Sequence, residues 1–414
     1  MASARSTLFA VMLVSLLGTA GIALPYPVLS PFFLDSGSDN ALTQFMGLHP
    51  KLLLGIILAL YPLGILIGSS FIGALSDIYG RKPVLIISLL AAAAGYLLTG
   101  YAIAIEHYPL FALARIITGI CEGNIAISRA IALELHPHID RTRAISLLYA
   151  TTYAGWLVGP LAGGYMMPLG VANVFLITAV VTVLATVVVQ FAIVARPVVM
   201  AATAAGPEAD PHPQTVMQAV RQNNSLGLLR IPAIQPLIIY HLLYTLGLNA
   251  FYEFYPLWLV ERFHFDSIRI GWATVVITLA MIVTSIYAVS PLERIFGPLG
   301  TVKRGSLALA LTFMLLPLAG SLSLYPAFLA CGAIIAVTNG IFPAYMANNF
   351  EEYGHGRVQG LLTTNFCFAN VVAALGGSAI ALLGTGWSLF TGGVLCALAS
   401  MWLFSRGPHY APAN

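Results

Sequence analysis

Charged residues interrupt one long apolar stretch of the chain, residues 109–135, and three of them are regularly spaced. Arg115, Glu122 and Arg129 recur in it at intervals of seven residues. A charged group at the centre of a bilayer costs ~2.5–3.5 kcal/mol on insertion scales, so each of the three is a candidate functional residue. Seven residues of α-helix turn through ~700°, only ~20° short of two full turns, so the spacing predicts one stripe that faces a water-filled cavity. Neighbours on this stripe are ~10 Å apart along the axis, which is too far for a direct ion pair.

Glu122 is the candidate proton carrier on this stripe. Burial favours its neutral form and the two arginines favour its charged form, so its charge could respond to a bound substrate. The alternative is a fixed counter-ion that holds this helix against its neighbours. Arg115 and Arg129 either bind a substrate anion or extend their guanidinium groups toward the membrane interface.

A second set of polar residues lies in the apolar stretch 233–256. It contains His241, Tyr244, Asn249 and Glu253, and the last two are one helical turn apart. His241 can titrate near neutral pH, and Glu253 could exchange protons with the outside. The alternatives are a histidine that serves packing and a carboxylate that ends its helix at the outer interface.

Aromatic and amide side chains form a possible pocket for a ring-bearing ligand. Tyr149, Tyr153 and Trp156 supply stacking surfaces, and Asn365 and Asn370 supply hydrogen bonds. Positions in the core or at the membrane interface are the alternative explanation for these aromatic residues.

The composition indicates the environment in which these residues act. Hydrophobic residues make up 59% of the 414, charged residues 8%, and the mean hydropathy is +0.90. This amount of polar surface is too small to cover a water-soluble protein of this size. A bilayer is therefore the expected solvent. The net charge of +3 is scattered along the chain, which excludes a nucleic-acid partner. The four cysteines lie in apolar runs without metal-ligand spacing, so we expect no metal site.

Apolar windows of about 20 residues predict an all-α membrane protein with twelve transmembrane helices. The predicted spans are residues 7–29, 52–74, 83–104, 109–135, 143–167, 171–195, 233–256, 267–289, 301–322, 325–347, 357–383 and 387–405. The first span imitates a signal peptide, but its apolar run is long enough to cross the bilayer. The spans form two six-helix, pseudo-symmetric bundles, residues 1–195 and 233–414, joined by a polar cytoplasmic linker, residues 196–232. Thirteen Lys and Arg residues fall in loops on one side and three on the other, which predicts that both termini are cytoplasmic.

The loop after the second span resembles the signature loop of the major facilitator superfamily. It reads Gly73-Ala-Leu-Ser-Asp77-Ile-Tyr-Gly80-Arg81-Lys82. Its glycines allow a tight turn, and Asp77 can pair with a basic residue or a helix amino terminus as a cytoplasmic latch. The orientation rule by itself would explain Arg81 and Lys82, but not the whole pattern.

Further motifs extend the resemblance over most of the chain. Arg115-Ile-Ile-Thr-Gly119 resembles a fourth-span pattern of this family. Gly155-Trp-Leu-Val-Gly159-Pro160-Leu-Ala-Gly163-Gly164 resembles the fifth-span motif that the family associates with export in exchange for protons. Ordinary packing of small residues is the alternative reading of this second motif.

The tetracycline-exporter branch of drug:proton antiporters is the part of the family that the chain resembles. Segments that carry this likeness include Gly21-Ile-Ala-Leu-Pro-Tyr-Pro27, Glu261-Arg-Phe-His-Phe265 and Gly356-Arg-Val-Gln359-Gly360. The chain departs from the branch where Gly18 stands in place of an expected first-span Asp. A second departure is the second-half copy of the signature loop, which is reduced to Ser290-Pro-Leu-Glu293-Arg294-Ile-Phe-Gly297.

These observations predict a secondary active transporter of the bacterial inner membrane that works by alternating access. The sequence has neither an HExxH motif nor a Ser or Cys with His at helical spacing, so we do not expect an enzyme. It has no GxxxxGK loop, so the expected energy source is a proton gradient without a cofactor. A receptor or scaffold would not need buried charge in both halves. We expect a monomer whose partners are the lipid bilayer and a small-molecule substrate.

The substrate is either an amphipathic drug or an anionic molecule. The fifth-span motif favours proton-coupled efflux of a drug or metabolite. The two intramembrane arginines and the missing first-span Asp favour uptake or export of an anionic metabolite or a siderophore-like chelate.

Overall fold

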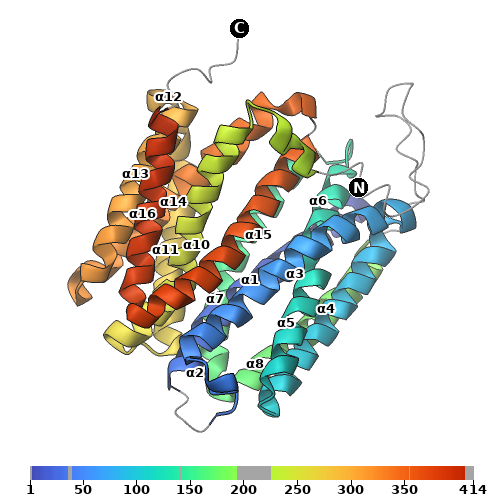
Figure 1. Cartoon of the computed structure of the whole chain (residues 1–414). Helices are drawn as coiled ribbons and strands as arrows, with labels where there is room; N and C mark the ends of the chain where they lie inside the picture. The colour runs from blue at the N-terminus through green and yellow to red at the C-terminus, as the bar shows by residue number, and fades with distance from the viewer. Residues whose placement is uncertain (1, 36–39, 140, 194–224, 354, 406–414) are drawn as a thin grey trace. The chain divides into compact units, whose positions relative to one another are not determined.

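The computed structural model describes residues 2–35, 40–139, 141–193, 225–353 and 355–405. In these ranges the regular elements are all helices (Figure 1). The helices of the first half are α1 (Ala2–Ala23), α2 (Pro25–Asp35), α3 (Pro50–Tyr79), α4 (Arg81–Ala104), α5 (Tyr108–Cys121), α6 (Ile125–Leu133), α7 (Arg141–Met166) and α8 (Val171–Ala192). Those of the second half are α10 (Gln235–Phe263), α11 (Ser267–Tyr287), α12 (Val289–Phe296), α13 (Pro298–Leu315), α14 (Ser321–Asn349), α15 (His355–Ile380) and α16 (Thr385–Ser405). Short 3₁₀ turns join several of them, including η2 (Glu122–Asn124) and η7 (Ala381–Leu383).

Ten helical segments of the described residues are long and apolar enough to cross a membrane. The shortest has 21 residues, which at ~1.5 Å per residue matches a hydrocarbon core of ~30 Å. Helices α7 and α10 have 26 and 29 residues and are also long enough, but they are not among the ten. Together the described segments reach the twelve helices that the sequence predicts.

Two of the predicted spans are each broken into two helices. The first is interrupted at Leu24, between α1 and α2, where Pro25 begins the new helix without a backbone N–H to continue the old one. The fourth is broken by η2, which separates α5 from α6. Gly123 lies in this turn, and a Cβ there would come within 2.8–2.9 Å of the backbone of Gly68 and Ser69 in α3. The break therefore permits a close approach of two backbones that a larger residue would prevent.

The chain divides into two compact units. The first contains Met1–Ala23, Leu60–Gly159 and Leu169–Asn224, and the second contains Leu24–Ala59, Pro160–Pro168 and Ser225–Asn414. The division into residues 1–195 and 233–414 stays a prediction, and most of the predicted linker, residues 196–232, lies outside the described residues.

In the first unit, α4 packs against α5 and α8, and α1 packs against α6 and α8. An apolar core lies between these helices, with Val11, Leu85, Ile127 and Val189 all at most 1% exposed. Gly95 of α4 faces Thr118 of α5, and a Cβ at Gly95 would lie 3.1 Å from the Thr118 backbone. This close packing fixes α5, which carries Arg115 and leads into Glu122.

In the second unit, α10 packs against α15 and α16, and α13 packs against α14 and α16. Phe251 of α10 stacks on Phe313 of α13 with ring centroids 4.6 Å apart, which adds aromatic packing to the core. An ion pair joins Lys51, which is buried at the start of α3, to Glu261, which is exposed near the end of α10. Lys51 Nζ also donates to the Ala381 carbonyl at 2.8 Å, and Thr385 Oγ1 donates to Glu261 at 2.5 Å. This network connects the ends of three segments that are far apart in the sequence.

Candidate functional site

Glu122 is the centre of a polar cluster in the first unit. It is the first residue of η2, its residue exposure is 4%, and its Oε1 accepts a hydrogen bond of 2.5 Å from the Tyr96 hydroxyl of α4. Its Oε2 has no hydrogen-bond partner among the described residues. One side of the carboxyl group is therefore held in place, and the other is open to a further donor.

Arg115 lies in α5, the helix that ends directly before Glu122, and is only 2% exposed. Its guanidinium carbon is 4.3 Å from the centroid of the Tyr61 ring and 6.0 Å from that of Phe175. A desolvated cation over an aromatic ring gains ~2 kcal/mol. In the described part of the chain, Arg115 Nε and Nη1 have no hydrogen-bond partner. The arginine is stabilised by ring faces and retains open donors.

Arg129 is separated from the other two charges by the 3₁₀ turn. Residues in a 3₁₀ helix advance by ~120° instead of ~100°, so three of them rotate the next helix, α6, by ~60°. The prediction of one continuous helix through all three charges is wrong at this point, because η2 interrupts it. Arg129 is half-buried in α6, whereas Arg115 and Glu122 are buried. The structure thus places two of the three charges in one buried cluster.

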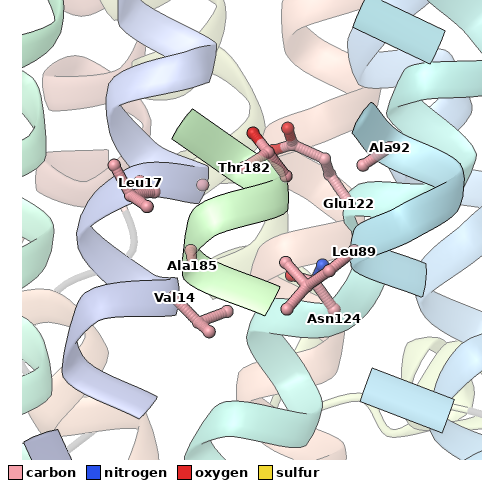
Figure 2. A pocket seen from close by; sticks show the side chains of 9 residues that line it. Val14, Leu17, Leu89, Ala92, Glu122, Asn124, Thr182 and Ala185 are labelled. Carbon is pink, nitrogen blue, oxygen red and sulfur yellow. The ribbon is translucent and has the colours of Figure 1, made fainter. Parts of the chain in front are cut away.

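A small cavity adjoins the Glu122 carboxyl group (Figure 2). It has room for about one water molecule. Its lining comes from α1, α4, η2 and α8 and consists of Val14, Leu17, Gly18, Leu89, Ala92, Glu122, Asn124, Thr182 and Ala185. Asn124 is 2% exposed, and its Oδ1 has no hydrogen-bond partner among the described residues. The cavity therefore brings two open acceptors to one small space, which is also lined by Gly18, the position where the sequence lacks the expected Asp.

Gly21 of α1 packs directly on the hydrogen bond between Tyr96 and Glu122. A Cβ at this position would collide with the Tyr96 hydroxyl and would lie 3.4 Å from Glu122 Oε1. Three residues of this site, Tyr61, Tyr96 and Asn124, are not indicated by the sequence pattern. The tyrosines sit in apolar spans, where their type and spacing are also those of core residues, and no sequence signal separates the two cases.

In the second unit, α10 and α15 are joined by imidazole and amide groups. Asn365 Nδ2 lies 2.6 Å from His241 Nδ1, and Asn370 Nδ2 donates to Asn249 Oδ1 at 3.3 Å. Asn249 Nδ2 in turn donates to the Phe366 carbonyl at 3.4 Å. The four predicted residues His241, Asn249, Asn365 and Asn370 are therefore brought together by one helix pair, with all four side chains buried.

Tyr244 and Glu253 have different surroundings on the same helix, α10. The Tyr244 hydroxyl donates to Asn339 Oδ1 of α14 at 3.0 Å, so it links α10 to a third helix. Glu253 is 0% exposed, and neither of its carboxyl oxygens has a hydrogen-bond partner among the described residues. The structure thus gives Tyr244 a hydrogen-bond partner, whereas in the described part of the chain both oxygens of Glu253 are without one.

The pocket expected for a ring-bearing ligand combines residues of both units and stays a prediction. Tyr153 and Trp156 are half-buried in α7 of the first unit, and Asn365 and Asn370 belong to the second. The side chain of Tyr149 lies outside the described residues.

The signature loop is anchored by its basic residues. Arg81 Nε donates to Glu134 Oε1 at 3.1 Å, and Arg81 Nη1 donates to Ser76 Oγ at 2.7 Å. Lys82 Nζ donates to the Gln190 carbonyl at 2.7 Å. Gly80 has a φ of 94°, a backbone conformation that favours glycine. The side chain of Asp77, the residue predicted to form the latch, lies outside the described residues, as does any contact it makes.

The fifth-span motif makes close helix contacts. A Cβ at Gly155 would lie 2.8 Å from the Leu16 carbonyl, and one at Gly159 would lie 2.9 Å from Ala20 Cα, both in α1. In the second unit, a Cβ at Gly163 would lie 2.8 Å from the Leu24 carbonyl, and one at Gly164 would lie 3.1 Å from the Ser267 carbonyl carbon. Pro160 is inside α7, and its carbonyl faces Gly271 of α11. These contacts show the packing role of the motif, and its link to export stays a prediction.

Comparisons with known proteins match nearly the whole chain. The family model for the Major Facilitator Superfamily matches residues 7–374. The tetracycline resistance protein, class E, of Escherichia coli is 24% identical over 425 residues, which cover 99% of this chain and 97% of that protein. The class H protein of Pasteurella multocida is 31% identical over 176 residues, 42% of this chain. Here the chain spans only 41% of the relative's length, and the match to the Escherichia coli class B protein is similarly partial at 42%.

Solved structures show the same fold. The human organic anion transporter MFSD10 (TETRAN) has a TM-score of 0.69 at 20% identity and covers 97% of this chain and 99% of its own. A D-xylose–proton symporter has a TM-score of 0.71 at 16% identity and covers 98% of both chains. At these identities the likeness concerns the fold.

Proposed function

Because this chain belongs to the major facilitator superfamily of membrane transporters, we propose that it exports a small organic molecule in exchange for protons. The observation that carries the proposal is Glu122, a buried carboxyl group with one oxygen held by Tyr96 and the other open. The proposed location is a bacterial inner membrane with both termini in the cytoplasm. The tetracycline resistance relatives and the basic loops support this location.

Glu122 is suited to hold and release a proton because some features of its surroundings favour the charged carboxylate and others favour the neutral acid. The Tyr96 hydroxyl and the nearby Arg115 stabilise the carboxylate, whereas burial stabilises the neutral acid. Protonation changes the combined charge of Arg115 and Glu122 from zero to one positive charge. A cavity that gains a charge favours a different conformation or a different ligand, and this difference couples the proton to the cargo.

The cluster on α10 and α15 supplies groups for cargo recognition. His241, Asn249, Asn365 and Asn370 are neutral or weakly basic groups that donate and accept hydrogen bonds, as recognition of an amphipathic drug requires. The names of the tetracycline resistance relatives make tetracycline the first substrate to test. Gly18 removes one carboxylate from α1, and Glu122 lines the same cavity, so the site keeps an acidic group from a different helix.

A second candidate cargo is an organic anion, such as an anionic metabolite or a siderophore-like chelate, taken up or exported. The observation that favours it is Arg115, whose Nε and Nη1 are buried without hydrogen-bond partners among the described residues. A guanidinium group with open donors binds a carboxylate in a bidentate manner.

Transport into membrane vesicles of both orientations tests these proposals. Radiolabelled tetracycline and a radiolabelled aromatic carboxylate are offered to inverted and right-side-out vesicles, with and without a pH gradient. We expect accumulation of tetracycline in inverted vesicles when the lumen is acidic, and loss of this accumulation when the gradient is collapsed. Accumulation only in right-side-out vesicles would refute export, and accumulation of the carboxylate in place of tetracycline would select the second cargo. Glu106→Gln, at an exposed glutamate in a loop, is the matched control for later glutamate variants.

A further inference from the structure

Three buried polar atoms with open hydrogen-bonding capacity follow one another from η2 into α6. They are Glu122 Oε2, Asn124 Oδ1 and Ser128 Oγ, and none has a hydrogen-bond partner among the described residues. The three residues are 4%, 2% and 0% exposed. Since more than about 90% of buried polar groups in proteins are paired, three such atoms within seven residues indicate a place for a small polar ligand.

The cavity between Glu122 and Asn124 fits one water molecule. It has room for about one water, and it is lined by Glu122 and Asn124, whose open oxygen atoms are acceptors when Glu122 is charged. A water molecule offers two O–H donors, one for each of these acceptors. The cavity is too small for an organic cargo, so its occupant differs from the transported molecule.

Few titratable groups face Glu122 from the helices around it. Tyr96 comes from α4, Tyr61 from α3, and Arg115 and Cys121 from α5. Helices α1 and α8 line the cavity with Gly18, Thr182 and apolar side chains. A sodium ion would need several more oxygen ligands than this cavity supplies, and Arg115 would repel it.

We propose that a water molecule bridges Glu122 and Asn124 and carries the proton between Glu122 and the end of α6. The O–H bond of the Glu122 acid breaks as a new O–H bond forms on the water oxygen. The water then passes one of its other protons to the Ser128 hydroxyl oxygen, and Ser128 gives up its own proton to bulk water at the end of α6, so the carboxylate, an unchanged water and an unchanged serine remain. Asn124 positions the water, because an amide oxygen accepts a hydrogen bond without taking the proton.

Ser128 marks the direction of this path. It follows Asn124, the residue that caps the start of α6, by four residues and therefore lies near the same face, one turn or ~6 Å further along the axis. Further in this direction, α6 ends directly before Glu134, which accepts a hydrogen bond from Arg81 of the signature loop. The path therefore runs toward the side that we propose is cytoplasmic. This inference rests on the proposed proton exchange at Glu122.

Infrared spectroscopy after a rapid pH jump tests the path in the purified full-length protein. The carboxyl C=O band that disappears in Glu122→Gln reports the charge of Glu122. We expect Asn124→Leu to slow the decay of this band by about tenfold and Ser128→Ala to slow it severalfold. Ser88→Ala is the matched control, because Ser88 is a buried serine of the same unit whose hydroxyl already bonds to the Leu85 carbonyl. We expect it to decay at the wild-type rate.

Several outcomes separate this inference from the proposed function. Wild-type decay in Asn124→Leu would refute the water path and leave proton exchange at Glu122 intact. If Asn124→Leu does not fold, two other variants decide the question. They are Asn124→Ser, which keeps an oxygen, and Ser128→Ala. Wild-type decay in Ser128→Ala refutes the direction of the path. A band that shifts when sodium chloride replaces choline chloride would assign the cavity to sodium and refute the water. Absence of any pH-dependent band lost in Glu122→Gln would refute the proposed function itself.

Discussion

Among the described residues, each of the two units buries one carboxyl group, and the two groups differ in their hydrogen bonding. Glu122 and Glu253 are 4% and 0% exposed. Glu122 accepts a hydrogen bond from Tyr96 and lies near Arg115, whose charge is held by aromatic rings. Glu253 has no hydrogen-bond partner for either oxygen among the described residues. The same side chain at similar burial therefore has a hydrogen-bond donor and a nearby cation in one unit, and no hydrogen-bond partner among the described residues in the other.

This difference separates two functional possibilities. A carboxylate buried without a partner costs several kcal/mol, so Glu253 is expected to be uncharged in this conformation. Glu122 has donors and a cation for its charged form and burial for its neutral form, so it can change charge while it stays buried. Of these two carboxyl groups, Glu122 has the surroundings of a group that couples a proton to a cargo, and Glu253 would exchange a proton only when the protein changes shape.

The largest expected effect comes from replacing each glutamate with its neutral isostere. Glu122→Gln is expected to lower pH-gradient-driven transport by at least about 100-fold, because the proton site is lost. Glu253→Gln is expected to retain most of the transport and all of the stability, because an amide resembles an uncharged acid. Tetracycline uptake into inverted vesicles measures both, with Glu106→Gln as control. Equal losses of transport in the two variants would contradict the expected difference between Glu122 and Glu253.

A smaller effect is expected from added volume at Gly21. Gly21→Ala places a methyl group on the Tyr96 hydroxyl and displaces it from Glu122, so we expect transport to fall by about tenfold. Gly376→Ala is the control, because a Cβ at Gly376 of α15 would have no neighbour within 4 Å. Transport in both variants is measured at matched protein levels. A wild-type rate for Gly21→Ala would show that this hydrogen bond is not needed for coupling.

Removal of single hydroxyl groups compares the two units directly. Tyr96→Phe removes a hydrogen bond to a carboxyl group, and Tyr244→Phe removes one to the neutral Asn339 amide. We expect a loss of about 1.5–3 kcal/mol in the free energy of unfolding for the first and about 1 kcal/mol for the second, since bonds to charged groups are stronger. Unfolding in detergent micelles measures the difference. A smaller loss for Tyr96→Phe would indicate that Glu122 is neutral in the folded protein.

The smallest effect is expected at the signature loop. Glu134→Gln removes the ion pair with Arg81, and the side chains of Glu134 and Arg81 are 46% and 29% exposed. Exposed pairs contribute about 0–1 kcal/mol, so we expect stability to change by less than about 1 kcal/mol. Thermal unfolding at low and high salt checks this expectation. A larger loss would mean that the loop anchors the first unit.

The sequence predicts the class of fold because hydropathy and loop charge depend on the membrane rather than on tertiary contacts. The same pattern also identifies Arg115 and Glu122, since charged groups in apolar spans are costly wherever the helices pack. It does not reveal η2, because this break depends on the approach of Gly123 to the backbone of Gly68 and Ser69. It does not reveal Tyr61 or Tyr96 either, because an apolar span gives no sign of which tyrosine faces a charge.

The second unit also contains contacts that the sequence does not indicate. His241 and Asn365 are 124 residues apart in the chain and meet through the pairing of α10 and α15. The sequence indicates that each is unusual in its span but does not indicate that the two are partners. Residue type therefore predicts which side chains need a partner, and only the packing of helices shows which partner each one obtains.

The ion pair between Lys51 and Glu261 has a consequence for sequence variation among homologous chains. Loss of Glu261 would leave the Lys51 ammonium group buried beside the Ala381 carbonyl, and leaving a buried charge unpaired costs about 3–5 kcal/mol. Replacement of both by apolar residues would cost far less. Among homologous chains these two positions should therefore change together, although 210 residues separate them in the sequence.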